Sequence, residues 1–255
     1  MIRDVDALRD DQWERLCDLV PGGRAGQRGP RCDNRRFVDA LLWMARSGGR
    51  WRDLPERFGD HQAVKRRYYR WIERGALDGF LEAFTAEGRS RMADDRLNNR
   101  ARPSARGRRK DRQRGADAQG LGRSRGGLST KIHAATDALG NPVRLLLGPG
   151  QRNDITKAHA LIEGFAADAI IADKGYDANH LRKAVLMREA EPVIPSKSNR
   201  RALLPYDKAL YKERNLVERF FNKLKQFRRV ATRYDKLLAN YRGFVLLAAI
   251  AIMLR

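Results

Sequence analysis

The spacing of apolar residues divides the chain into three parts with different patterns. Residues 1–87 carry apolar side chains at helical spacing, interrupted by glycines, which predicts a group of short helices. Residues 88–127 contain few large apolar side chains and are rich in arginine and glycine. From 128 to 255, runs typical of strands and helices alternate. We therefore predict a helical domain at 1–87, an irregular segment at 88–127 and an α/β domain at 128–255.

The α/β part is predicted to open with a β-hairpin, whose strands are LSTKIHAAT (128–136) and residues 143–147. The wholly apolar run 169–172 predicts a short central strand, because a strand that is apolar on both faces must be buried on both. The other expected elements are a helix capped by Asp154 or Thr156, a helix at 178–190, a strand at 192–195, a long helix at 208–230 and a buried helix at 240–254.

Basic and aromatic residues alternate between positions 61 and 75, near the end of the helical part. The cations are Lys65, Arg66, Arg67 and Arg70. This stretch predicts the second helix of a helix-turn-helix unit, with its cations directed at double-stranded DNA. The alternative is a small helical bundle whose cations only face water, because nothing in the pattern identifies a residue that contacts a base.

Charge is the feature of the composition that changes this picture most. Lys and Arg together number 53 and Asp and Glu 31, a formal net charge of +22, which favours nucleic acid as a partner over a membrane surface. Two cysteines exclude a disulfide framework and a cysteine-based zinc module. The sequence has no P-loop or GxSxG motif, no apolar leader and no apolar run of the ~20 residues that cross a bilayer. We expect a cytoplasmic protein.

A carboxylate follows the predicted central strand directly. Asp173 stands in the motif ADKGYD, at residues 172–177, where Gly175 allows a sharp turn. A carboxylate at the end of a buried strand is costly unless it meets a cation or a metal ion. A simple helix cap after the strand is the alternative.

Four polar residues share one side of the predicted long helix. At about 100° per residue they fall within about 60° of one another. They are Tyr211, Arg214, Glu218 and Lys225. An ion-paired surface stripe is one interpretation of this pattern. The other is metal chemistry, in which Glu218 and Asp173 hold Mg²⁺ through their carboxylate oxygens and the two cations position phosphates.

These motifs resemble those of bacterial insertion-sequence transposases of the DDE class, in the insertion-sequence-five group. The Tyr-x2-Arg-x3-Glu-x6-Lys spacing at 211–225 matches the signature of that class residue for residue. The resemblance covers about 1–92 and 121–255. Its other motifs are RWRDLPERFG (50–59), LGRSRGGLSTKIH (121–133), GPGQRND (148–154), ADKGYD (172–177), VIPSKSNR (193–200) and FRRVATRYDK (227–236).

The resemblance implies an RNase H-like catalytic domain of the α/β class, preceded by the all-helical, helix-turn-helix-like domain. It implies cleavage and strand transfer at the terminal inverted repeats of the element, with two Mg²⁺ ions, or Mn²⁺, bound by the catalytic acids. By this matching Asp173 is the second acid and Glu218 the third, and Tyr211, Arg214 and Lys225 contact DNA. A homodimer is the expected working form, acting on the repeats and on target DNA.

The first acid of the family motif, in a stretch similar to DSTIVRAH, has no counterpart in this chain. Codons allowed for residues 96–103 (RLNNRARP) encode Asp-Ser-Thr-Ile-Val-Arg-Ala and the start of His when they are read one base later. We therefore predict a frameshift that ends before Leu121, with 96–120 an irregular loop. In one hypothesis Asp95 replaces the lost catalytic and metal-binding acid. In the other, which we favour, the chain is a catalytically dead DNA-binding remnant or regulator.

Overall fold

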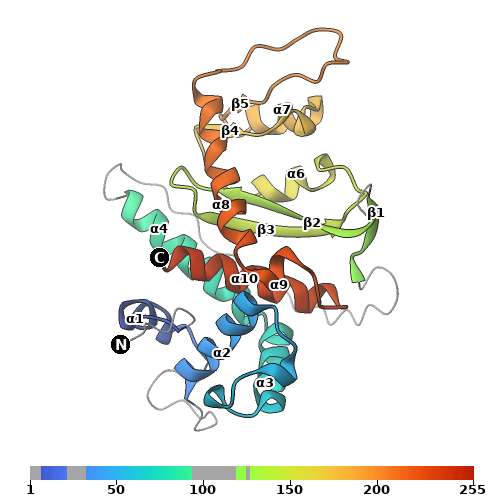
Figure 1. Cartoon of the computed structure of the whole chain (residues 1–255). Helices are drawn as coiled ribbons and strands as arrows, with labels where there is room; N and C mark the ends of the chain where they lie inside the picture. Colours follow the sequence, from blue (N-terminus) through green and yellow to red (C-terminus); the bar gives the residue numbers. More distant parts are fainter. Residues whose placement is uncertain (1–6, 22–32, 94–118, 125–126) are drawn as a thin grey trace. The chain divides into compact units, whose positions relative to one another are not determined.

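The computed structural model of the chain is drawn in Figure 1. It describes residues 7–21, 33–93, 119–124 and 127–255. Asp95 and most of the predicted irregular segment lie outside the described residues. The frameshift and the role of Asp95 therefore stay predictions. The described residues fall into two compact units.

The first unit comprises Met1–Gln119 and Leu224–Arg255. Its described part is helical, as predicted for the N-terminal region. The C-terminal segment differs from our prediction, because it belongs to the same compact unit as these helices. The helices are α1 (Asp10–Cys17), α2 (Asn34–Ser47), the 3-10 turns η1 (Trp51–Asp53) and η2 (Glu56–Phe58), α3 (His61–Arg74), α4 (Ala76–Ala93), α9 (Arg228–Ala231) and α10 (Leu238–Met253).

Helices α2 and α3 each begin after an N-cap aspartate and end at a glycine. The carboxylates of Asp33 and Asp60 accept hydrogen bonds from backbone N–H groups in the first turns of α2 and α3. Gly48 and Gly75 end the same helices at a φ of 66°, a conformation that suits residues without a Cβ atom. Local sequence therefore fixes the length of both helices.

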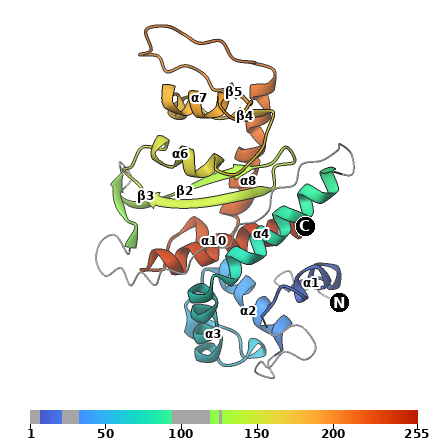
Figure 2. The ribbon, with the colours of Figure 1, turned by 180° about the vertical axis from the view of Figure 1, so that it is seen from behind.

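Helix α10 is apolar on all sides from Phe244 to its end, and it is the central helix of this unit. It packs against α2, α3, α4 and α9, and Figure 2 shows it crossing α4. Tyr68 on α3 lies with its ring centroid 4.6 Å from that of Phe244, and its hydroxyl donates to the carbonyl oxygen of Asn240 at 2.7 Å. A helix with no polar face needs partners all round it, which explains why the C-terminal segment joins this unit. No helix in the described part of the chain is long and apolar enough to cross a membrane.

A buried ion pair holds the turn between α9 and α10. Arg229 donates to both oxygens of Asp235, at 3.0 and 3.1 Å, and its guanidinium lies 4.4 Å from the centroid of the Phe244 ring. Replacing Asp235 by Ala leaves a guanidinium buried without its carboxylate, so we expect a loss of about 3–5 kcal/mol in the free energy of unfolding. Urea denaturation measures this loss. The exposed pair of Arg50 and Asp53 is the matched control, since Asp53→Ala should change stability far less; similar losses in both variants would contradict the prediction.

The second unit, Gly120–Lys223, contains the strands. The predicted hairpin is confirmed, with Ile132 opposite Leu147 in an antiparallel pair. The chain order is β1 (Gly122–Ser124), β2 (Gly127–Thr136), β3 (Pro142–Pro149), α6 (Ile155–Ile162), β4 (Ala169–Ile171), the turn η3 (Lys174–Tyr176), α7 (Asn179–Leu186), β5 (Glu191–Val193), the 3-10 turn η4 (Leu210–Arg214) and α8 (Asn215–Lys225), whose last two residues belong to the first unit.

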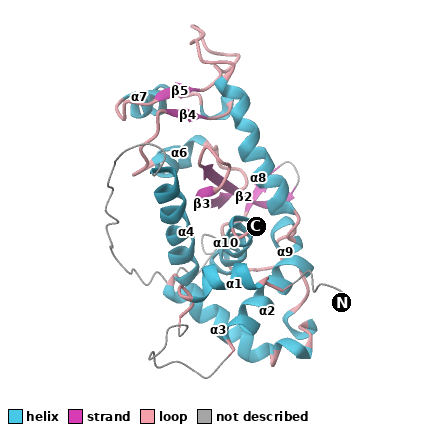
Figure 3. Cartoon of the chain, turned by 90° about the vertical axis from the view of Figure 1, so that its left-hand side faces the viewer, coloured by secondary structure: helices cyan, strands magenta, loops and turns pink. Residues whose placement is uncertain are grey.

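The strands of this unit form two sheets. The order β1-β2-β3 is antiparallel, and β4 pairs in parallel with β5, beside α7 (Figure 3). Helix α6 lies between the β2–β3 hairpin and α7 (Figure 1). Its Ala158 belongs to an apolar cluster with Leu181, Val185 and Ile194, against which Ile170 of β4 packs. This cluster joins the two sheets into one unit.

Two predictions about these elements were wrong. Among the described residues, β4 pairs only with β5 and its side chains are half-buried, so it is not a central strand there. Helices cover the apolar residues of β4. An apolar run in a sequence does not reveal whether neighbouring strands or helices will bury it. The long helix predicted at 208–230 consists of η4, α8 and α9, because the backbone of Phe227 is extended where its buried ring ends the helix.

Candidate functional site

The loop that follows β4 fixes the carboxylate of Asp173. The backbone N–H of Gly175 donates to Asp173 Oδ1 at 2.7 Å, so the side chain caps η3, as the alternative interpretation of this residue expected. The other oxygen, Oδ2, makes no hydrogen bond with any described residue. The side chain is half-buried. One carboxylate oxygen is therefore held by the backbone and the other is available to a ligand.

Asp177, the last residue of the ADKGYD motif, fixes this loop on its buried side. Asp177 is 1% exposed and receives hydrogen bonds from Arg182 at 2.8 Å, from Arg200 at 2.7 Å and from the backbone N–H of Lys197 at 2.9 Å. Two segments that the sequence shows as separate motifs are thus joined at one buried carboxylate. The sequence analysis assigned no role to Asp177, and its only signal was a second acid in a short motif.

A cluster of four polar side chains lies beside the same loop, and the sequence analysis missed it. Lys131 Nζ lies 3.0 Å from Asp154 Oδ1, and His133 Nδ1 lies 3.8 Å from the same oxygen and 3.5 Å from the hydroxyl of Tyr176. Asp154 is the N-cap residue of α6, but its side chain makes no capping hydrogen bond. Of the two residues predicted to cap this helix, Asp154 is the one at the N-cap position, and its carboxylate pairs with Lys131 in place of the backbone.

The electrostatics of the cluster favour the neutral forms of both rings, the Tyr176 phenol and the His133 imidazole. Burial raises the pKa of the Tyr176 phenol, and the nearby carboxylates of Asp154 and Asp173 raise it further. Burial also lowers the pKa of the His133 imidazole, against the opposing effect of Asp154. Lys131 balances the charge of Asp154, whereas Asp173 has no ion-pair partner in the part of the chain that the structure describes.

The predicted stripe begins in η4, which holds Tyr211 and Arg214, and continues on α8, and it contains an ion pair. Arg214 Nη2 donates to Glu218 Oε1 at 2.6 Å, and the guanidinium lies 5.6 Å from the centroid of the Tyr211 ring. The Glu218 side chain is 52% exposed. Lys225 is exposed at the end of the helix. Arg214 and Glu218 therefore form the ion-paired surface stripe that one of the two interpretations expected. The second oxygen of Glu218, Oε2, has no partner among the described residues.

The two acids lie on neighbouring elements of one unit. Strand β4, which ends just before Asp173, packs against η4, and η4 continues directly into the helix that carries Glu218. Carboxylate oxygens are the ligands that Mg²⁺ prefers, and each acid keeps one such oxygen free. Within the described residues no group of three or more His, Cys, Asp or Glu side chains is close enough to hold a metal ion. Each acid is by its chemistry a candidate ligand for a divalent cation.

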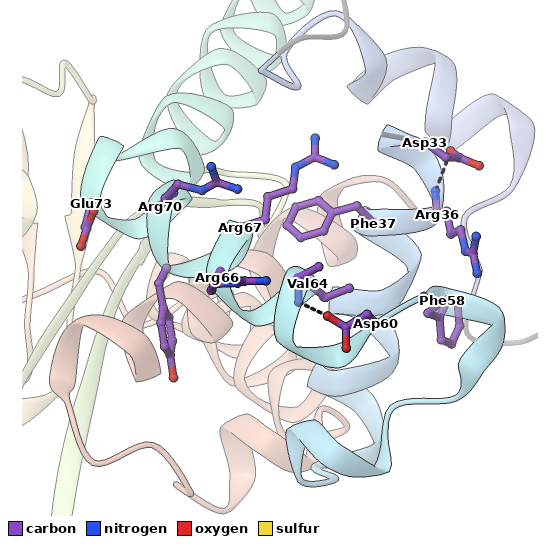
Figure 4. A pocket seen from close by; sticks show the side chains of 13 residues that line it. Asp33, Arg36, Phe37, Phe58, Asp60, Val64, Arg66, Arg67, Arg70 and Glu73 are labelled. Carbon is purple, nitrogen blue, oxygen red and sulfur yellow. Dashed lines mark hydrogen bonds between the residues drawn. The ribbon is translucent and has the colours of Figure 1, made fainter. Parts of the chain in front are cut away.

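Three of the four predicted DNA-binding residues of the first unit, Arg66, Arg67 and Arg70, line a cavity of about 860 Å³ beside α2 and α3, and Lys65 does not. Figure 4 shows Arg66, Arg67 and Arg70 extending from α3 along it. Arg67 is only 9% exposed; it donates to the side-chain oxygen of Asn34 and lies 4.1 Å from the centroid of the Phe37 ring. The structure therefore places Arg67 at the inner wall of the cavity, mostly buried within the helical unit.

The other predicted cations of α3 are accessible. Arg66 and Arg70 are exposed, and Lys65 is half-exposed, with its ammonium 5.8 Å from the centroid of the Tyr69 ring. The two aspartates on the cavity wall, Asp33 and Asp60, direct their carboxylates at backbone N–H groups of the helices that they cap. The outer side of α3 thus offers cations to an anionic partner.

Two family models match the chain. The first, described as "Putative transposase of IS4/5 family", matches residues 8–81, and the second, described as "Transposase DDE domain", matches residues 100–254. No solved structure matches the chain. The second match covers the end of β4 with Asp173, and α8 with Glu218.

Three relatives are similar to parts of the chain, and two of them are described as transposases. "Uncharacterized protein y4sN" of Sinorhizobium fredii is 70% identical over 84 residues, which are 33% of this chain and 67% of the relative. "Putative transposase for insertion sequence element IS6501" of Brucella ovis is 42% identical over 130 residues, which are 50% of this chain and 100% of the relative. The protein of the same description for IS402 of Burkholderia cepacia is 30% identical over 119 residues, 42% of this chain and 54% of the relative. The resemblance seen in the motifs is confirmed, and the chain belongs to the family of insertion-sequence transposases with a DDE domain.

Proposed function

We propose that this chain is derived from an enzyme that binds the terminal inverted repeats of an insertion sequence and cleaves and joins DNA there with divalent metal ions. The observation that carries the proposal is the carboxylate of Asp173, fixed at the end of β4 by one oxygen and free at the other. The neighbouring helix α8 supplies a second acid, Glu218, with an arginine beside it. Both acids fall within the matched DDE domain.

In this proposal β4, its loop and α8 are parts of an RNase H-like catalytic domain. Asp173 and Glu218 would hold Mg²⁺, or Mn²⁺, and the bound ion would supply activation of a water or 3′-OH and stabilisation of the leaving oxygen of a phosphodiester. Arg214, which donates to Glu218 in the structure, would position a phosphate, and Tyr211 and Lys225 would contact the same DNA. The helical unit holds the duplex through Lys65, Arg66 and Arg70, and two copies of the chain act together on the two ends of the element.

A second candidate function is a DNA-binding remnant or regulator without catalysis. The sequence of residues 96–110 favours it, because this stretch has arginines and asparagines where a buried strand needs apolar side chains. Burying such cations unpaired costs more than a strand returns. The family to which the chain belongs therefore does not decide whether the chain is active. Its activity depends on the first catalytic acid.

The proposal is tested by nicking of DNA that carries the ends of the element. The assay uses a version in which the alternative reading frame restores DSTIVRAH. Asp173→Asn and Glu218→Gln should each lower the Mg²⁺-dependent rate about 100-fold, since a catalytic metal contributes several kcal/mol to transition-state stabilisation. Glu213→Gln, an exposed carboxylate just before α8, is the matched control and should leave the rate unchanged. Equal rates in all four proteins would refute the assignment of the two acids.

A further inference from the structure

Gly175 stands in direct contact with the carboxylate of Asp173. A Cβ atom placed on Gly175 would lie 2.8 Å from Asp173 Oδ1, closer than such atoms approach each other in proteins. The next neighbours of that position are Asp154 Oδ2 and Asp173 Cγ, both at 3.8 Å, an ordinary contact distance. A side chain at residue 175 would therefore collide with one atom only, the oxygen that the Gly175 N–H holds.

The backbone itself does not require glycine here. Gly175 is not one of the glycines with a positive φ, so an alanine can adopt its conformation without strain. The atom in the way is the end of a flexible side chain, which can rotate away at little cost to the fold. Gly175 therefore supplies space for the carboxylate of Asp173.

We infer that Gly175 is a positioning residue for Asp173: by having no side chain, it lets its own N–H hold Oδ1 and directs Oδ2 at a divalent metal ion. Asp173 then binds the metal through a single oxygen, because the other stays on the backbone. The buried side of the loop supports this arrangement, since Asp177 is held by Arg182 and Arg200. The inference rests on the proposed function, in which Asp173 is a metal ligand.

The test is Mn²⁺ binding by the full chain, measured as free Mn²⁺ by electron paramagnetic resonance, which needs no catalytic activity. Gly175→Ala should weaken binding at least about tenfold, the usual effect of disturbing a group that orients a ligand. Gly79→Ala is the matched control, because a Cβ atom at that exposed helical position meets no atom within 4 Å. It should bind Mn²⁺ as the unchanged chain does. Asp173→Asn should weaken binding at least as much as Gly175→Ala.

A double variant separates positioning from a general effect on folding. In Asp173→Ala the oxygen in question is absent, so adding Gly175→Ala should change neither Mn²⁺ binding nor the thermal unfolding midpoint any further. A lower midpoint in the double variant would show that the methyl group collides elsewhere, and would overturn the inference. Normal Mn²⁺ binding by Gly175→Ala would also overturn it and leave the proposed function standing. Normal binding by Asp173→Asn would remove Asp173 from the metal site and with it the proposed function.

Discussion

Replacing residues 96–120 by the sequence of the alternative reading frame is expected to raise Mg²⁺-dependent nicking of terminal-repeat DNA about 1,000-fold. The change restores the first acid and also supplies apolar residues that can form the strand holding it. A ligand displaced by about 1 Å can cost 100-fold in rate, and a missing ligand with no strand behind it costs more. The measurement is the initial rate of nicking of end-labelled DNA by the two proteins at equal concentration.

The same assay decides between the two hypotheses for Asp95. If the chain as given already nicks DNA at a rate similar to the restored version, and Asp95→Ala abolishes that activity, the chain is a working enzyme and inactivation by a frameshift is wrong. If only the restored version nicks DNA, and Asp95→Ala has no effect on the chain as given, the result supports the hypothesis of a catalytically dead remnant. Chelation by EDTA should stop nicking in either case, because the phosphodiester chemistry depends on the metal.

Reversing three cations of α3 should nearly abolish DNA binding. Lys65→Glu, Arg66→Glu and Arg70→Glu together remove three charge-assisted contacts of about 1.5 kcal/mol each, so affinity for duplex DNA should fall about 1,000-fold. The slope of log affinity against log salt concentration should also fall by about one per lost phosphate contact. Fluorescence anisotropy over a range of salt concentrations measures both quantities.

A second triple variant is the control for the change in net charge. Arg9→Glu, Arg50→Glu and Arg52→Glu are exposed cations of the same unit, and their reversal changes the net charge by the same amount. This control should lose far less affinity, because only long-range attraction is weakened. Equal losses in the two triple variants would mean that the duplex is attracted by overall charge. Unchanged affinity in the α3 variant would place the DNA contact elsewhere.

Local patterns predicted much of the fold and part of the candidate site. The hairpin followed from alternation in LSTKIHAAT, and the strand ending at Asp173 followed from a short apolar run. The contact between Arg214 and Glu218 followed from helical spacing, because residues four apart lie on one side of a helix. Each of these features depends on residues that are close in the sequence.

Features that depend on distant residues were beyond such patterns. The carboxylate of Asp154 binds Lys131 of β2, which is 23 positions earlier, and competition of this kind cannot be read from a capping pattern. Arg67 belongs to a run of cations but is buried against the ring of Phe37. The buried C-terminal helix was predicted correctly as an element, yet its partners were not, since a wholly apolar helix has no face that indicates them.

The clamp at Asp177 has a consequence for how this sequence can diverge. One buried carboxylate accepts hydrogen bonds from the guanidinium groups of Arg182 and Arg200, which lie 5 and 23 positions later in the chain. Losing the acid alone would leave two guanidinium groups close together without a carboxylate, whereas losing one arginine would leave a neutral pair of one acid and one cation. A diverging copy of the gene should therefore lose an arginine before it loses Asp177. Descendants that keep both arginines without the acid should be rare, even in copies that no longer cut DNA but still need this unit to fold.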